Sequence, residues 1–92
     1  MNVNITEKIK GGNTLVFQAK AQKARLQLKG SGTITAQVSI DYTMGGEPVW
    51  SDAIENTAAF SGGVAEVMLE GMLSDDYIKI TATSLTEAII NE

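Results

Sequence analysis

The sequence predicts a small all-β protein folded as a β-sandwich of about seven or eight short antiparallel strands. Apolar and polar residues alternate with a period of two along most of the chain, as they do in strands with one buried face. Glycine-containing turn signals separate the alternating runs at intervals of about ten residues. A chain of 92 residues suits a single domain, so residues 1–92 are expected to share one core.

The N-terminal region holds two predicted strands and one irregular stretch. The strands lie in NVNITEK (2–8) and NTLVFQA (13–19), with a turn at KGGN (10–13) between them. Because this turn is glycine-rich, residues 1–12 are interpreted as a candidate mobile N-terminal arm that folds onto a neighbouring molecule as an added strand. QAKAQKAR (18–25) has no turn residue and only weak alternation, which indicates an irregular edge segment or one helical turn.

Four later runs carry the clearest strand patterns: ARLQLKG (24–30), GTITAQVSIDYT (32–43), VAEVMLEG (64–71) and DYIKITATS (76–84). In each of them every second residue is apolar, which predicts one buried face and one solvent-facing face. The predicted inward residues are Leu26, Leu28, Ile34, Ala36, Val38, Ile40, Tyr42, Ala65, Val67, Leu69, Ile78, Ile80 and Ala82. Such strands fit an immunoglobulin-like or a jelly-roll-like sandwich.

Weaker strand signals lie at AAF (58–60) and EAIIN (87–91). SLTEAII (84–90) competes as a helix, but it is short and its neighbours are strand-like, so we expect no helix there. The turns between the later strands are expected at KGSG, MGGEP, SGG and LSDD, which occupy residues 29–32, 44–48, 61–63 and 73–76.

Charge is divided unevenly along the chain. Residues 1–30 contain six basic residues and one acidic residue (net +5), whereas residues 31–92 contain one basic and ten acidic residues (net −9). Two interpretations remain open. The early basic residues are either solvated residues of strand faces, or a patch that binds an acidic surface or an acidic region of a second copy.

The residue types that most often carry catalysis or hold metals are missing. The chain has no cysteine and no histidine, which excludes Cys–His and Ser–His–Asp catalysis and the usual zinc ligands. The adjacent pair Asp75–Asp76 precedes a predicted strand, where such residues typically cap a turn. We therefore expect a protein that is not an enzyme and that has no catalytic residues, no metal and no cofactor.

Nucleic acids and membranes are also excluded as expected partners. Of the aromatic residues Phe17, Tyr42, Trp50, Phe60 and Tyr77, only Phe17 lies in the basic third, so basic and stacking side chains are not interleaved. No stretch approaches the roughly 18 apolar residues of a membrane span. The first ten residues lack the pattern of a signal peptide, which predicts synthesis and folding in the cytoplasm.

The stretch SIDYTMGGEPVW (39–50) contains the only tryptophan and the only proline. Pro48 cannot donate a ladder hydrogen bond, so Val49 and Trp50 are expected to begin an edge or a loop. Trp50 either closes one end of the core or lies exposed at an interface. Tyr77 is out of phase with the inward isoleucines and is expected to face outward, so these two aromatics could bind a carbohydrate.

From residue 24 onward, the order of these motifs resembles the order found in small structural proteins of tailed-phage virions. The resemblance rests on ARLQLKGSGTITAQVSIDYT, then EPVWSDA, then a Thr/Ala/Gly-rich strand pair, then DYIKITATSL, and it covers roughly two thirds of the chain. This sequence departs from the pattern in two places, because TMGGEP replaces an Asn-Asp-Gly-type turn and Lys79 stands where an arginine is common.

The resemblance implies a non-enzymatic virion structural protein. The implied role is a capsid decoration or cement protein that binds the phage head lattice, stabilises the head and lies on the capsid exterior. The implied partners are the major capsid protein or another virion protein, together with self-association into a homo-oligomer such as a trimer. Many equivalent lattice sites would let modest contacts add up to tight attachment.

Two alternatives remain open: a carbohydrate- or receptor-binding β-sandwich module associated with a tail or surface, and a structural insert in a tube or baseplate. The candidate interface residues under the virion hypothesis are Lys20, Lys23, Arg25, Lys29, Met44, Glu47, Pro48, Val49, Trp50 and Tyr77.

Overall fold

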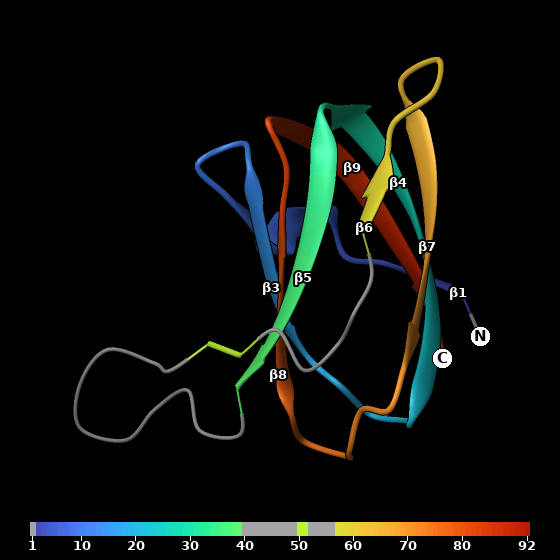
Figure 1. Cartoon of the computed structure of the whole chain (residues 1–92). Helices are drawn as coiled ribbons and strands as arrows, with labels where there is room; N and C mark the ends of the chain where they lie inside the picture. Colours follow the sequence, from blue (N-terminus) through green and yellow to red (C-terminus); the bar gives the residue numbers. More distant parts are fainter. Residues whose placement is uncertain (1, 40–49, 52–56) are drawn as a thin grey trace.

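A computed structural model describes residues 2–39, 50–51 and 57–92 of the chain (Figure 1). The described elements are β1 Asn2–Asn4, the 3-10 helix η1 Thr6–Lys8, β2 Ile9–Lys10, β3 Thr14–Gln18, β4 Lys23–Ser31, β5 Thr33–Ser39, β6 Thr57–Ala59, β7 Val64–Glu70, β8 Tyr77–Thr81 and β9 Ser84–Asn91. The all-β prediction is confirmed, with nine described strands where seven or eight were expected. Within the described ranges no helix has the length and hydrophobicity that a membrane span requires.

The strands form two antiparallel sheets that pack face to face as a sandwich. Sheet A has the order β1-β9-β4-β7, and sheet B has the order β2-β3-β8-β5-β6. In Figure 1, β3, β8 and β5 form the left and front layer, and β9, β4 and β7 lie to the right of it. Sequence neighbours such as β4 and β5 lie in different sheets, so the strand order could not be read from the succession of strands alone.

The core lies between the two sheets and is built from their inward positions. In β4, β7 and β8 the buried residues alternate with exposed or half-buried ones, as the sequence pattern predicts. Ile34 and Ala36 of β5 are buried and Val38 packs partly against the core, whereas Ile40 and Tyr42 lie outside the described residues. The most deeply buried large side chains are Leu15, Leu26, Leu28, Ile34, Val67, Leu69, Met72, Ile78 and Ile80.

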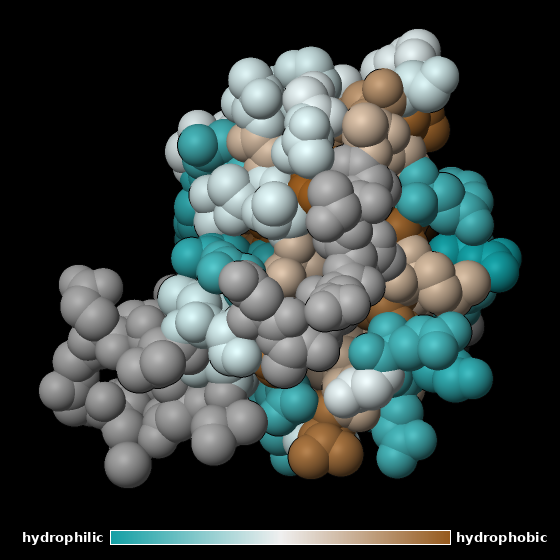
Figure 2. Space-filling view, viewed as in Figure 1, coloured by the Kyte–Doolittle hydropathy of each residue, from teal (hydrophilic) through white to brown (hydrophobic). Residues whose placement is uncertain are grey.

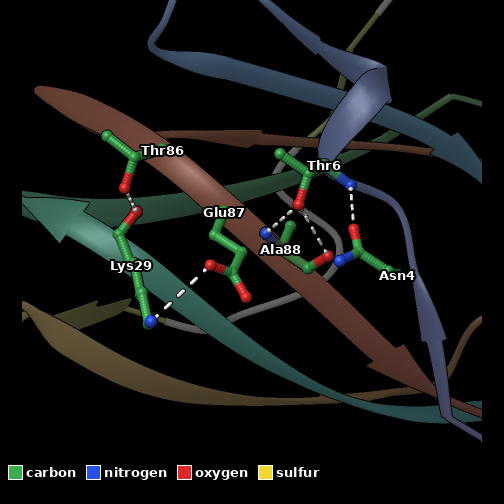
Figure 3. Close-up of polar contacts among 6 residues, drawn as sticks. All are labelled: Asn4, Thr6, Lys29, Thr86, Glu87 and Ala88. Carbon is green, nitrogen blue, oxygen red and sulfur yellow. Dashed lines mark hydrogen bonds and ion pairs between the residues drawn. The ribbon is translucent and has the colours of Figure 1, made fainter.

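The N-terminal segment joins both sheets along one edge of the sandwich. β1 pairs with β9 in sheet A, and β2 pairs with β3 in sheet B. Between them Ile5 is buried and its N–H donates to the carbonyl oxygen of Ala88 at 2.9 Å. The Thr6 hydroxyl accepts from the Ala88 N–H at 3.0 Å, and the Asn4 side chain accepts from the Thr6 N–H at 2.9 Å (Figure 3). Residues 2–10 are therefore docked here, and a mobile arm over residues 1–12 stays a prediction.

Two glycines near the end of β4 allow the chain to cross from sheet A to sheet B. The expected turn at residues 29–32 is shorter than predicted, because β4 continues to Ser31 and β5 begins at Thr33. Gly32 makes the corner with a φ of 94°, a conformation that favours glycine. The pairing of β4 with β9 shifts register between Lys29 and Gly30, which leaves Thr86 as an extra residue of a β-bulge.

Candidate functional site

The structure divides the predicted interface residues between two opposite faces of the sandwich. Lys23, Arg25 and Lys29 lie at outward positions of β4 on sheet A. Trp50 and Tyr77 lie on the outer side of sheet B, so the sandwich separates them from the basic residues. Lys20 lies in the connection between β3 and β4 and is exposed, and its backbone N–H donates to Oε2 of Glu92 at 2.7 Å. Met44, Glu47, Pro48 and Val49 lie outside the described residues.

On the outer face of sheet A, the basic residues are matched by acidic residues of the neighbouring strands. Nε of Arg25 lies 3.2 Å from Oε1 of Glu66 on β7, and Nζ of Lys29 lies 3.6 Å from Oε2 of Glu87 on β9 (Figure 3). Lys23 is the direct register partner of Glu70.

The tertiary structure thereby brings the basic early part of the chain and its acidic later part together. The basic strand β4 lies between two strands from the acidic part, β7 and β9. Each basic outward residue of β4 thus has a glutamate at a neighbouring position, and the face carries no net charge at these positions. This arrangement favours solvated, locally paired residues over a patch of unmatched positive charge.

We expect the Arg25–Glu66 ion pair to contribute little to stability. Both side chains are 54% exposed, and exposed pairs of this kind contribute less than about 1 kcal/mol because water and salt screen them. Replacing Glu66 with glutamine should therefore change the free energy of unfolding by less than about 1 kcal/mol. Urea denaturation at low and high salt tests this, and a larger loss would mean that Glu66 has a further structural role.

Arg25 lies on this face between two shallow hollows, in the row where β4 pairs with Asn91, the last residue of β9. One hollow is lined by Arg25 with Asn2, Gln27, Ile89 and Asn91, and the other by Arg25 with Lys23, Ala24, Met68 and Asn91. Met68 is the register partner of Arg25 on β7 and is 41% exposed. This part of sheet A therefore combines a guanidinium group with accessible apolar side chains, and Glu66 lies beside it on β7.

The outer face of sheet B carries the two aromatic residues predicted from the sequence. Tyr77 is the direct cross-strand neighbour of Ser39. An antiparallel bridge between Val38 and Ser51 places Trp50 beside Ser39 on its other side. Ser39 is only 4% exposed although it faces outward, and an aromatic residue lies on each side of it. The outward position of Tyr77 is confirmed, and Trp50 lies half-buried on the sheet surface and does not close the core.

Lys79 completes this group, and its role could not be predicted from the sequence. Its Nζ lies 4.8 Å from the centroid of the Trp50 ring, within the range of a cation–π interaction. Period-two alternation placed Lys79 outward but did not indicate its neighbour. The pairing of β5 with β8 creates the contact, because it brings the row of Gln37 and Lys79 next to the row of Ser39 and Tyr77.

The described residues show no arrangement typical of a metal site, since no three His, Cys, Asp or Glu side chains among them are grouped to hold an ion. Asp76 acts as predicted for a turn residue, because its Oδ2 accepts from the Leu73 N–H at 3.0 Å. Comparisons of the chain with protein-family models, with curated proteins and with solved structures gave no match.

Proposed function

We propose that the protein is a non-enzymatic structural protein of a phage virion that decorates and stabilises the capsid. The outer face of sheet A is its contact surface in this proposal. The observation that carries it is the position of Arg25 on that face, between hollows that Met68 and Ile89 help to line. Arginine and methionine are enriched in the centres of protein–protein interfaces, where they are shielded by polar surroundings.

The charges on this face largely compensate one another, so its partner surface need not carry a strong charge of its own. Because Arg25 and Lys29 are paired within the molecule, attachment does not depend on a strongly acidic partner. The outer surface of the four-stranded sheet would dock at every equivalent site of a lattice, and many copies bound side by side compensate for modest affinity per copy.

The location is tested by immunogold labelling of particles purified from a lysate of the encoding phage. Gold distributed over the heads supports decoration, whereas gold confined to the tails would overturn it. An absence of labelling on intact particles would also contradict the proposal that the protein lies on the capsid exterior.

The contact surface is tested with a matched pair of surface variants. Met68→Lys places a charge beside Arg25 on the outer face of sheet A, and Thr35→Lys places one at an exposed position of sheet B. In co-sedimentation with particles that lack the protein, Met68→Lys should reduce affinity by about tenfold or more, a loss of about 1.4 kcal/mol. Thr35→Lys should bind like the unmodified protein.

Circular dichroism and urea midpoints establish that both variants fold. Equal binding by Met68→Lys and the unmodified protein would contradict the assignment to sheet A. Loss of binding by Thr35→Lys alone would move the contact surface to sheet B.

A second candidate function is carbohydrate binding by the outer face of sheet B. It is favoured by one observation: Trp50 and Tyr77 lie on either side of Ser39 in one row of that face. They are separated by two strand spacings, roughly 10 Å. Saccharide sites on β-sandwiches use such partly exposed aromatic rings, whose apolar faces pack on sugar rings while polar neighbours bind hydroxyl groups.

A further inference from the structure

The two outer faces of the sandwich differ in the chemistry of their exposed side chains. Glutamates line both sides of the basic strand on sheet A. At the described outward positions of sheet B there is no carboxylate. Those positions are held by Lys10, Thr14, Val16, Gln18, Thr33, Thr35, Gln37, Ser39, Ala59, Tyr77, Lys79 and Thr81, with Trp50 beside them. Figure 2 shows strongly hydrophilic residues along β7 and residues of intermediate hydropathy around the upper end of β5.

Lys79 is the one cation among the described outward residues of β3, β5 and β8, whereas Lys10 lies on the same face in the edge strand β2, two strands from β8. The cross-strand neighbours of Lys79 are Val16 on β3 and Gln37 on β5, neither of which is charged. No ion pair joins Lys79 to an acidic residue within the described part of the chain. The nearest acids along the chain, Asp75 and Asp76, belong to the turn before β8, and Asp76 is directed to the backbone of Leu73.

Trp50 limits the conformational freedom of the Lys79 side chain. The ammonium lies over the indole ring at 4.8 Å from its centroid, so the charge is held close to an aromatic surface. Lys79 is also half-buried, which reduces the entropy that the side chain loses on binding a ligand. An ammonium group held in this position can pair with an anionic group of a ligand, while a ring of the same ligand packs on a neighbouring aromatic side chain.

The remaining side chains on the face fit the polar groups of a sugar. Gln18 supplies an amide whose Nε2 donates to the Asp75 carbonyl at 3.3 Å and whose oxygen can accept, and the threonines supply hydroxyl groups that both donate and accept. A polyhydroxylated ligand matches such a surface, because each sugar hydroxyl also donates and accepts. Nucleic acid fits poorly, since its phosphates need several cations and the net charge of this chain is −4.

From these observations we infer that the outer face of sheet B binds an acidic saccharide, with Lys79 paired to a sugar carboxylate and Trp50 and Tyr77 packed on sugar rings. The inference deepens the second candidate function and rests on it, and it is independent of capsid decoration. It adds the class of ligand, an anionic sugar, and it assigns the anion-binding role to Lys79.

The test is isothermal titration calorimetry with three probes of similar length. Hexagalacturonate carries carboxylates on sugar rings, maltohexaose carries neutral rings, and hexaglutamate carries carboxylates without rings. We expect hexagalacturonate to bind at least tenfold more tightly than either of the other two probes. Its affinity should fall as ionic strength rises, because salt screens a partly exposed charge pair.

Two variants and a control locate the binding. Lys79→Met keeps the apolar stem and removes the charge, so it should weaken hexagalacturonate binding about tenfold and leave maltohexaose binding unchanged. Trp50→Ala should weaken the binding of both saccharides. Lys23→Met removes an exposed lysine from sheet A and should change neither.

Each contrary result overturns a distinct part of the inference. Equal binding of maltohexaose and hexagalacturonate would retain carbohydrate binding and remove the anion-binding role of Lys79. Equal binding of hexaglutamate would show general charge attraction and overturn saccharide recognition. An absence of binding to all three probes would overturn the inference together with the second candidate function.

Discussion

Replacing Leu26 with alanine should lower the free energy of unfolding by about 2–5 kcal/mol. Leu26 is fully buried in β4, the strand that pairs with both β7 and β9. Its register partners are Val67 and Ile90, which are buried as well, so the truncated side chain leaves a cavity lined by apolar groups. The cost combines the lost burial of the removed carbons with the contacts that the cavity lining loses.

A loss of this size is large for such a small domain. Domains have stabilities of about 5–15 kcal/mol, and a short chain buries a smaller share of its surface than a long one. The measurement is urea denaturation followed by circular dichroism, with Gln27→Ala as the matched control. Gln27 lies next to Leu26 on the exposed side of β4 and should change stability by less than about 0.5 kcal/mol. Similar losses for both variants would contradict the assignment of Leu26 to the core.

A second large effect is expected for Gly30→Ala. Although Gly30 belongs to strand β4, a β-carbon at this position would overlap the carbonyl oxygen of Ser84 and lie 2.8 Å from its carbonyl carbon. The obstructing atoms are backbone atoms of β9 and cannot rotate away as a side chain can. The two strands would have to separate at the bulge, with an expected loss of about 3 kcal/mol.

The matched control for Gly30 is Gly62→Ala, in the turn between β6 and β7. Gly62 has a φ of 63°, and a β-carbon there meets no atom within 4 Å. Alanine at this position is strained only by its backbone conformation, so we expect a loss of about 1 kcal/mol. Thermal unfolding of both variants compares a steric effect with a conformational one. If Gly62→Ala is the more damaging change, the close approach of β4 to β9 is not the dominant constraint.

The two functional proposals use opposite faces of one sandwich, so they can be tested without interfering with each other. Met68→Lys changes sheet A and should leave saccharide binding intact, whereas Lys79→Met changes sheet B and should leave particle binding intact. A lattice-bound copy attached through sheet A would present sheet B outward. Each variant therefore serves as a folded control for the other proposal.

The local patterns of the sequence predicted the buried faces correctly. Leu26 and Leu28, like Ile78 and Ile80, alternate with polar residues, and a strand places such residues on one side whatever its partners are. The turn residues of SGG and LSDD also act where the sequence places them, since residues 61–63 join β6 to β7 and residues 73–76 precede β8. Both kinds of signal depend on the geometry of a few consecutive residues.

Other predictions were incomplete because they depended on distant residues. KGSG contains a turn, but Gly30 belongs to a strand, where it allows β9 to approach closely. The irregular region predicted at residues 18–25 is shorter, because β4 already begins at Lys23 and pairs with Glu70 of β7. The weak signal EAIIN underestimated β9, which runs from Ser84 to Asn91 and occupies an inner position in sheet A.

By itself, the sequence determined the fold class, the single core and the side of each clear strand that is buried, because these follow from the spacing of apolar residues along the chain. Only the tertiary structure decided which strands are neighbours, and with it the chemistry of both surfaces. Placing β4 between two acidic strands pairs Arg25 and Lys29 with glutamates, and placing β8 beside β5 brings Lys79 to Trp50. Strand pairing joins residues that are far apart in the chain, so the local pattern of either strand does not contain this information.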